Sequence, residues 1–269
     1  MTITLPNIHP TAIVEDGAKV SNSCKIGPYC CVGPEVTLDH NVSLVSHVVI
    51  SGRTFIGRGT KVWPFSSVGS EPQDLKYNGE KSTLTIGQNN LIRECVSIST
   101  GTDGGGGITS IGNNCLFMLG SHVGHDCKLG DNIIIANNSA IAGHVIIEDN
   151  VNIGGLVGVH QFCRIGEGSM IGAHAMVSKD IIPFSMIVGM RPVLSGVNLV
   201  GLKRRGSKKE DIKKLVDVFS RLFERKGNQN FQERLEAIDK DELYQIAEVK
   251  KVVTFMKQES TRSYVAPKN

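Results

Sequence analysis

Aromatic residues are scarce in this 269-residue chain. They make up 5% of it, with a single Trp, although 40% of the residues are hydrophobic. A core built mainly from aliphatic side chains fits a narrow, repetitive interior better than a thick globular one. No apolar run approaches the length of a membrane span, and the first ten residues lack the basic and apolar regions of a secretory signal peptide. We therefore expect no integral membrane segment.

The cysteines show no C-x-x-C spacing, and a strong net charge is also absent. The chain has seven cysteines and a formal charge of +3 at pH 7. An odd cysteine count without a secretion signal indicates reduced thiols and a cytoplasmic protein. The charge alone gives no indication of a nucleic-acid partner. In residues 203–214, however, seven basic residues stand against two acidic ones, a cluster that suits a diphosphate or an acidic carrier protein.

The chain is rich in a six-residue repeat. Every sixth residue is Ile, Val or Leu over residues 8–68, 86–98 and 111–177, with Phe117 as the sole departure. Repetition at a fixed period is the signature of a solenoid. A period of six fits neither a helix nor an exposed strand, but it suits a short strand plus a turn with one aliphatic side chain pointing inward.

Three such units close one coil of about 18 residues, which is the hexapeptide parallel β-helix. Successive coils would stack about 4.8 Å apart. The polar stretches 70–82 and 101–110 interrupt the repeat and are predicted to be loop insertions. We predict a parallel β-helix over residues 1–190, although the repeat itself leaves the handedness of the coil open.

The turn and cysteine positions support this prediction. Asn114, Asn132 and Asn150 recur at intervals of one predicted coil, and Asn tolerates the left-handed conformation that a corner needs. Other side chains lie four residues after a periodic aliphatic and are predicted to face inward as small hydrophobes, not as nucleophiles or metal ligands. These are Cys24, Cys30, Cys115, Cys127 and Cys163.

The pattern changes to helical spacing after Gly206, so residues 191–269 are predicted to form a C-terminal α-helical domain. Ser207 and Glu210 are predicted to form the capping box of its first long helix. A second helix is predicted around residues 231–238, and a third is predicted to open at Asp239. These helices could cap the solenoid or pack between subunits.

Stacking of the predicted coils would bring four histidines together. Gly143 would lie one coil above His125, and Gln161 one coil above Gly143. His144 would lie one coil above Asp126. A single histidine on a half-buried surface needs no function, but a cluster of them indicates a site. The clustered histidines are His122, His125, His144 and His160.

Two chemistries remain open for this cluster. Imidazole is the commonest zinc ligand, so a zinc enzyme of the carbonic anhydrase type is one candidate. The other is acyl transfer, with a histidine as general base and the backbone N–H of a glycine one coil above it as an oxyanion donor, a role that Gly143 fits by stacking. Because no Ser or Cys lies in an activated-nucleophile motif, direct transfer is favoured over a covalent intermediate. A purely structural solenoid would not need clustered histidines.

Four segments together resemble one family closely. HVGHDCKLGDN at 122–132, AGHV at 142–145, VHQFCRIG at 159–166 and GLKRRG at 201–206 look like the acyl-carrier-protein–UDP-N-acetylglucosamine O-acyltransferases, which catalyse the first step of lipid A biosynthesis. The resemblance covers nearly the whole chain, including both insertions and the helical tail. It implies a left-handed β-helix, a homotrimer with active sites between subunits, and no metal or bound cofactor.

The resemblance also implies transfer of an R-3-hydroxyacyl group from acyl carrier protein to the 3-hydroxyl of UDP-N-acetylglucosamine. It implies His125 as the base, the Gly143 N–H as the oxyanion donor and Asp126 as the acidic neighbour of the base. Ala173 matches the family's hydrocarbon ruler, where Gly permits the longest chains. Substrate contacts are implied for Asp74, Lys76, His122, His144, His160, Gln161, Asn198, Arg204 and Arg205.

The sequence departs from the family pattern at Val200, where an acidic residue is expected, and at Met190, where Asn is expected. A related N-acyltransferase acts later in the pathway and carries an N-terminal nucleotide-binding domain. The repeat here begins by Ile8, which favours the O-acyltransferase. The preferred acyl length, and a 3-hydroxyl against a 3-amine on the acceptor, stay open.

Overall fold

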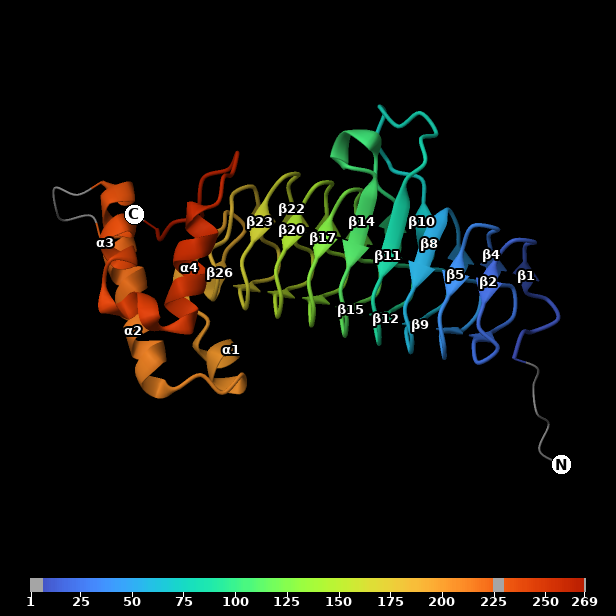
Figure 1. Ribbon diagram of the computed structural model, residues 1–269, viewed down its shortest axis with the longest axis horizontal. Helices are drawn as coiled ribbons and strands as arrows, with labels where there is room; N and C mark the ends of the chain where they lie inside the picture. The colour runs from blue at the N-terminus through green and yellow to red at the C-terminus, as the bar shows by residue number, and fades with distance from the viewer. Residues whose placement is uncertain (1–6, 225–229, 269) are drawn as a thin grey trace.

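The computed structural model describes residues 7–224 and 230–268 as an elongated prism with a group of helices at its C-terminal end (Figure 1). Residues 1–6, which the predicted β-helix includes, lie outside the described part. Short parallel strands wind along the prism, and each of its three sides is one sheet.

Each sheet takes every third strand of the chain. Sheet 1 contains β1 (Ile13–Val14), β4 (Cys31–Val32), β7 (Val49–Ile50), β10 (Ser67–Ser70), β13 (Ser97–Ser99), β16 (His122–Val123), β19 (Ala140–Ile141), β22 (Gly158–Val159) and β25 (Met176–Val177). Sheet 2 contains β2 (Lys19–Val20), β5 (Thr37–Leu38), β8 (Arg53–Ile56), β11 (Thr83–Ile86), β14 (Ile108–Ile111), β17 (Lys128–Leu129), β20 (Ile146–Ile147) and β23 (Arg164–Ile165). Sheet 3 contains β3 (Lys25–Ile26), β6 (Ser43–Leu44), β9 (Lys61–Val62), β12 (Leu91–Ile92), β15 (Leu116–Phe117), β18 (Ile134–Ile135), β21 (Asn152–Ile153), β24 (Met170–Ile171), β26 (Ser185–Val188) and β27 (Val193–Val197).

Neighbouring strands pair with an offset of one coil. His122, for example, pairs with Ala140, which holds the same place in the next coil. Within each two-residue strand the second side chain is the more buried, as in β17, where Lys128 is exposed and Leu129 is buried. The predicted period and the predicted coil length are both confirmed. The parallel pairing reaches β26, and β27 then turns back antiparallel to it.

The periodic side chains fill the inside of the prism. Over residues 26–177 every one of them is buried, and Phe117 is 0% exposed. The predicted inward row fails at the N-terminal end of the described part, where Ile8 is 42% exposed and Val14 is only partly buried, because no described coil lies beyond these residues to cover them. The five cysteines predicted to face inward are confirmed as buried, each at most 1% exposed.

Corner residues adopt the left-handed conformation. At one corner Tyr29, His47 and Phe65 have φ values of 58°, 52° and 63°. Bulky residues seldom adopt positive φ, and here their rings pack on one another with centroids 4.9 and 5.2 Å apart. At another corner the predicted ladder is confirmed, with φ of 56°, 57° and 60° at Asn114, Asn132 and Asn150.

The two insertions lie in consecutive coils and project from the same side of the prism (Figure 1). Ser67 pairs with Ser97, and Ser97 pairs with His122, so both offsets exceed one coil. The second insertion contains a short 3₁₀ helix, η1 (Asp103–Gly105). It ends sooner than predicted, because β14 begins at Ile108 and not after Ser110.

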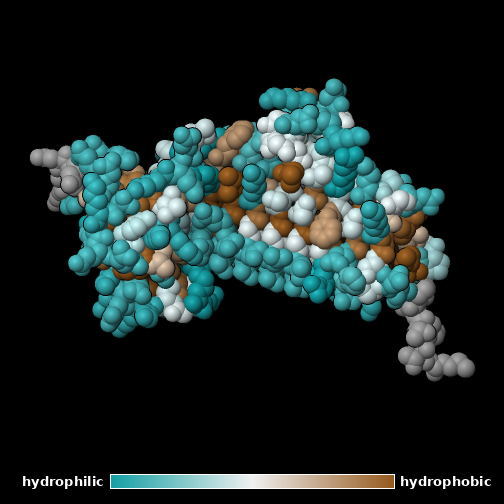
Figure 2. All heavy atoms as spheres, viewed as in Figure 1, coloured by the Kyte–Doolittle hydropathy of each residue, from teal (hydrophilic) through white to brown (hydrophobic). Residues whose placement is uncertain are grey.

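The helical part consists of α1 (Leu199–Arg204), α2 (Lys209–Leu222), α3 (Phe231–Asp239), η2 (Glu242–Gln245) and α4 (Ala247–Lys257). None of the helices among the described residues has the length and apolar character needed to cross a membrane. Figure 2 shows a largely hydrophilic surface over this part, in contrast to a row of hydrophobic and uncharged side chains along the prism.

Two sequence predictions about these helices were wrong. The predicted capping box at Ser207 is absent, because the Ser207 hydroxyl donates to the Glu248 carboxylate at 2.6 Å and α2 begins after Lys208 without a side-chain cap. The third helix does not open at Asp239, where α3 ends. Instead Asp241 caps the 3₁₀ turn, accepting from the Leu243 N–H.

A buried ion pair joins the helical part to the last coils. The Arg164 Nε donates to the Asp180 carboxylate at 2.8 Å. The same guanidinium reaches the Phe255 carbonyl at 3.3 Å, the Gln258 side chain at 3.0 Å and the Tyr264 hydroxyl at 3.5 Å. One side chain therefore holds both α4 and the C-terminal tail against the coils.

Candidate active site

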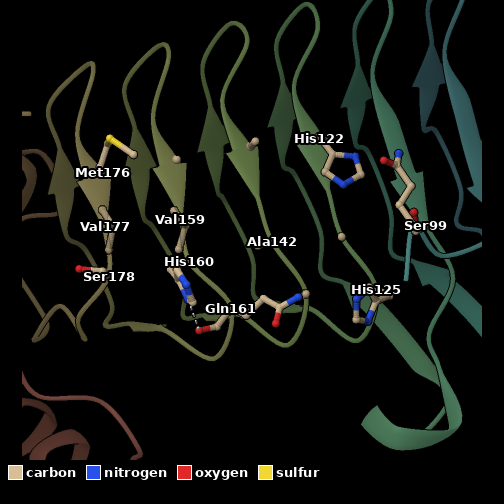
Figure 3. Close-up of a pocket in the computed structure, with 15 residues that line it drawn as sticks. Ser99, His122, His125, Ala142, Val159, His160, Gln161, Met176, Val177 and Ser178 are labelled. Atoms are coloured by element: carbon tan, nitrogen blue, oxygen red, sulfur yellow. Dashed lines mark hydrogen bonds between the residues drawn. The ribbon is translucent and has the colours of Figure 1, made fainter. Parts of the chain in front are cut away.

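A groove of about 440 Å³ runs along the outer face of sheet 1 (Figure 3). Its floor is formed by outward-facing residues that recur once per coil, namely His122, Ala140, Gly158 and Met176. His125, Gly143, His160 and Gln161 line its edge at the corner that follows this sheet. The groove thus combines small and apolar residues with imidazoles.

His125 is held by its neighbour in sequence. Its Nδ1 lies 2.7 Å from the Asp126 Oδ2, and the side chains are 6% and 1% exposed. An ionised carboxylate can only accept, so Nδ1 carries the proton and Nε2 keeps a free lone pair in the neutral ring. This arrangement leaves His125 Nε2 at the edge of the groove as an unprotonated nitrogen that is able to accept a proton.

Asp126 is fixed in turn by the second insertion. Its carboxylate accepts from the Thr102 N–H at 2.8 Å and from the Thr102 hydroxyl at 2.6 Å. Its own N–H donates to the Thr109 hydroxyl at 2.8 Å, and its φ is 59°. A Cβ at Gly105 would lie 2.0 Å from the Asp126 carboxyl carbon, so the loop can approach only because that residue is glycine.

Gly143 lies against the imidazole ring of His125, as the stacking of coils predicted. A Cβ built on Gly143 would come within 2.5 Å of the His125 Cε1 and 2.6 Å of its Nε2. Any side chain at this position would displace the imidazole. The backbone of Gly143 is thereby brought beside the Nε2 of His125.

His144 borders a second hollow of about 360 Å³ that also includes Asp74 and Lys76. Its ring stacks on Phe162 with centroids 4.4 Å apart and meets His125 edge-on at 4.9 Å. Burial lowers the pKa of His144 below its ordinary value. Asp74 Oδ2 lies 3.9 Å from His125 Nε2, so the two hollows meet at His125.

His122 lies in the floor of the groove and bonds to Ser97 at 2.7 Å through its Nδ1. Burial lowers the pKa of His122 as well. A lowered pKa keeps the imidazole neutral near pH 7, so it can both donate and accept hydrogen bonds without charging the groove.

A metal site is sterically conceivable here. Among the described residues, ligand atoms of His125, Asp126 and His144 lie within 4.8 Å of one another. Tetrahedral zinc ligands are separated by roughly 3.4 Å, given bonds of about 2.0–2.2 Å. The 2.7 Å contact between His125 Nδ1 and Asp126 is shorter and is a hydrogen bond. These atoms are already committed to one another, which favours the base over the zinc site.

The chain matches two family models. Residues 108–143 and 144–179 match bacterial transferase hexapeptide repeats, and residues 180–265 match domain 2 of UDP N-acetylglucosamine O-acyltransferase. It is 42% identical over 267 residues to the acyl-[acyl-carrier-protein]–UDP-N-acetylglucosamine O-acyltransferase of Sinorhizobium fredii, covering 99% of this chain and 98% of the relative. The relative of that name from Paracoccus denitrificans is 49% identical over 77% of each chain.

Solved structures agree with this. The chain superposes on the structure of LpxA from Acinetobacter baumannii with a TM-score of 0.92, at 39% identity and with coverage of 96% of this chain and 99% of the other. A Francisella novicida UDP-N-acetylglucosamine acyltransferase gives a TM-score of 0.91 at 37% identity, with 97% and 95% covered.

The chain belongs to the UDP-N-acetylglucosamine O-acyltransferase family. The fold prediction, a left-handed parallel β-helix with C-terminal helices, is confirmed, and so is the prediction of an acyltransferase.

Four residues predicted to bind substrate in this O-acyltransferase lie away from the groove of their own chain. Asn198 is buried and caps α1, accepting from the Gly201 N–H and donating to the Gly168 carbonyl. Arg205 lies over Phe184 near the same corner, and Arg204 is exposed. Ala173 is exposed at the corner before β25 and is not among the groove-lining residues.

The two departures from the O-acyltransferase pattern are both exposed. Val200 in α1 is 54% exposed, and Met190 is 67% exposed. Sequence reasoning missed Met176 in the groove floor and Thr102, which holds Asp126. Met176 could have been found by counting whole coils from His122. Thr102 could not, because it lies in an insertion outside the repeat.

Proposed function

We propose that this acyltransferase moves an R-3-hydroxyacyl group from acyl carrier protein to the 3-hydroxyl of UDP-N-acetylglucosamine, the first step of lipid A biosynthesis. The observation that carries this proposal is the buried His125–Asp126 pair, which leaves one basic nitrogen at the edge of an apolar groove. The names of the curated relatives supply the two substrates.

In the proposed reaction His125 Nε2 takes the proton of the sugar hydroxyl, and the oxygen attacks the thioester carbonyl. A carbon–oxygen bond forms and the carbon–sulfur bond breaks as the tetrahedral intermediate collapses. The imidazolium then returns the proton to the departing thiolate. Asp126 stabilises the positive charge on the ring in between, as in other histidine–carboxylate pairs.

Direct transfer is favoured over an acyl-enzyme. Burial raises the pKa of Cys127, the cysteine nearest in sequence to the base, to about 12, so it stays a protonated thiol and a poor nucleophile. The Gly143 N–H is proposed to stabilise the oxyanion, since its backbone lies beside the base without a side chain in the way. This role requires neither a metal nor a bound cofactor.

Each of the two hollows suits a different substrate. The groove floor of Ala140, Gly158 and Met176 suits the acyl chain. The hollow that contains Asp74, Lys76 and His144 is polar and charged, which suits the sugar nucleotide. The two meet at His125, where the thioester and the hydroxyl must meet.

A homotrimer is proposed because the site in one chain is incomplete. Arg205 and Asn198 lie around Gly168, at a corner that joins sheets 2 and 3, while the groove lies at the corner between sheets 1 and 2. A second copy could bring this cluster to the groove of the first. Three copies around one axis would complete three sites, each between two subunits.

The basic segment 203–214 is proposed to bind the diphosphate or the acidic carrier protein.

A cytoplasmic location is proposed from the seven cysteines, which are free thiols in the structure. Nucleic acid is not a proposed partner, given the small net charge of +3.

An acyl-transfer assay tests the proposal. Purified protein is incubated with acyl carrier proteins carrying 3-hydroxyacyl chains of different lengths, and with UDP-N-acetylglucosamine or its 3-amino analogue. We expect an O-acylated sugar nucleotide from the 3-hydroxyl acceptor. Transfer to the 3-amine alone would overturn the choice of acceptor, and no transfer from any donor would overturn the proposal.

The zinc alternative is tested with the same assay. A catalytic zinc needs about three protein ligands and a water. We expect full activity after chelation and no stoichiometric zinc by elemental analysis. One zinc per chain, with activity lost on its removal and regained on its return, would favour the alternative.

A further inference from the structure

The C-terminal tail passes beside the groove, and it is firmly held there. The Asp180 N–H donates to the Ser263 carbonyl at 2.9 Å, and the Val265 N–H donates to the Asp180 carbonyl at 2.9 Å. One residue further, the Leu194 N–H donates to the Ala266 carbonyl at 3.0 Å. The tail is thus a short added strand along the last coil, and the position of Arg262 at its start is set by backbone bonds.

Arg262 reaches two groups that line the groove. One nitrogen of its guanidinium lies 2.8 Å from the His160 Nδ1 and 2.9 Å from the Gln161 carbonyl oxygen. That nitrogen carries two hydrogens, one for each acceptor. The Arg262 side chain is partly buried, whereas His160 and Gln161 are exposed to the groove.

This contact decides which nitrogen of His160 carries the proton. A guanidinium has no acceptor, so a protonated Nδ1 would bring two N–H groups into opposition across this short contact. The alternative would have Nδ1 donate to the Gln161 carbonyl, but that contact is longer, at 3.3 Å. The shorter, charge-assisted contact dominates. In the neutral ring the proton therefore lies on Nε2.

We propose that Arg262 is a positioning residue that holds His160 as the Nε2–H tautomer, ready to donate a hydrogen bond to an oxygen of the substrate in the groove. The proposal rests on the proposed acyl transfer for the identity of that substrate. Under this proposal the rings of His125 and His160 are opposite tautomers. His125 has its proton on Nδ1 and acts as a base, whereas His160 has its proton on Nε2 and acts as a donor.

A double-mutant cycle tests this. Arg262→Met removes the guanidinium, His160→Ala removes the imidazole, and Thr261→Ala is the control on the exposed neighbour in the tail. We expect Arg262→Met to lower kcat/KM by about 3- to 10-fold, because the bond from the His160 Nε2–H to the substrate is weakened and a neutral hydrogen bond contributes about that much. Thr261→Ala should match the wild type. Because Arg262 acts through His160, the double variant should lose no more than His160→Ala alone. Losses that multiply in the double variant would overturn the proposal.

Nitrogen NMR of protein labelled at histidine reads the tautomer without any turnover, so it stays informative if the proposed function fails. The His160 signal is assigned by its absence from His160→Ala. We expect an unprotonated Nδ1 in the wild type and a shift toward a tautomer mixture in Arg262→Met. Arg262→Lys, whose ammonium can still donate to Nδ1, should restore the wild-type signal and guards against a misfolded tail in Arg262→Met. A protonated Nδ1 in the wild type, or an unchanged spectrum in a folded Arg262→Met, would contradict the proposal.

Discussion

The imidazole of His125 is the single group on which the proposed chemistry depends. Its replacement by Ala should lower turnover by about 10²–10⁴, the usual contribution of a general base. The fold should survive, because the side chain lies at the groove and not inside the prism. His40→Ala is the matched control, since His40 is an exposed histidine outside the groove that also contacts a neighbouring carboxylate, with its Nδ1 2.6 Å from the Asp39 Oδ1. Steady-state turnover and thermal unfolding should be measured on both variants. Near-normal turnover in folded His125→Ala would remove the residue from the mechanism.

Asp126 sets the state of that imidazole, so a subtle change there should be costly. Asn has the same shape and tolerates the φ of 59°, and its oxygen can still accept from the Thr102 N–H. Its amide nitrogen, however, would donate to His125 Nδ1 and move the ring proton to Nε2. We expect Asp126→Asn to lose about 10⁴ in kcat, the loss seen when the aspartate of a serine-protease triad is changed in the same way.

The measurement is kcat alongside the midpoint of thermal unfolding. A midpoint close to that of the wild type, together with the loss of kcat, identifies the tautomer as the cause. If Asp126→Asn kept its kcat, the carboxylate would be a structural acceptor for Thr102 and nothing more.

At the scale of one coil, the corner that carries Ala173 is predicted to limit the acyl chain. Ala173 is exposed in the single chain, and in the proposed trimer it would face whatever fills the space between subunits. A methyl group takes about one methylene of that space, and close-packed walls do not yield freely. Ala173→Gly should shift the preferred acyl length upward, by about 10- to 15-fold per two fully buried carbons, because each buried methylene contributes about 0.8 kcal/mol.

A competition assay with mixed chain lengths measures that shift. Ala140→Gly serves as the comparison, because it removes a methyl group from the groove floor itself and not from the Ala173 corner. Identical length profiles for the wild type and Ala173→Gly would place the ruler elsewhere.

The strands of this fold were easier to predict from the sequence than its helix ends. The period of six predicted the sheets, the coil length and the buried cysteines, because each coil repeats the same local environment. It predicted helix ends poorly. Ser207 had the sequence of a cap, but the carboxylate of Glu248, 41 residues away, competes for its hydroxyl. The prediction of a helix at Asp239 failed for a related reason, since Asp241 offers the backbone a tighter turn.

At the scale of the whole molecule, assembly should depend on the apolar face of sheet 1. Ile13, Val49 and Met176 point outward from this sheet and are 59%, 43% and 67% exposed. The ring stack that starts at Tyr29 lies at the adjoining corner. Exposed apolar side chains that recur along one face of the prism favour an interface on that face. Val49→Glu should therefore weaken the trimer, and activity per chain should fall with it, although Val49 lies far along the prism from His125.

Light scattering and turnover across a range of protein concentrations test this together. Lys128→Glu, a charge change on the outer face of sheet 2, should leave both unchanged. A trimeric and active Val49→Glu protein would show that sheet 1 is not the interface, and a wild-type monomer with full activity would overturn the trimer itself.

The site was predictable only in part, for reasons that belong to the whole molecule. Counting whole coils placed Gly143 on His125, because stacked coils keep their register. It could not place Thr102 or Arg262, since an insertion and a tail follow no repeat. Nor could it show that Asn198 is occupied within its own chain as the cap of α1.

The ion pair of Arg164 and Asp180 bears on how the protein is made. Contacts within the coils join residues one coil apart, so a nascent chain can stack them in the order in which they leave the ribosome. The bonds from Arg164 to α4 and the tail instead span 91 to 100 residues. The buried charge in the last coil therefore gains these partners only after the helices that follow the coils have been synthesised. Since Arg262 lies in the same segment as Tyr264, the wall of the groove is completed later than His125 and Asp126, and a chain that ended before this segment would carry the His125–Asp126 pair beside an incomplete groove.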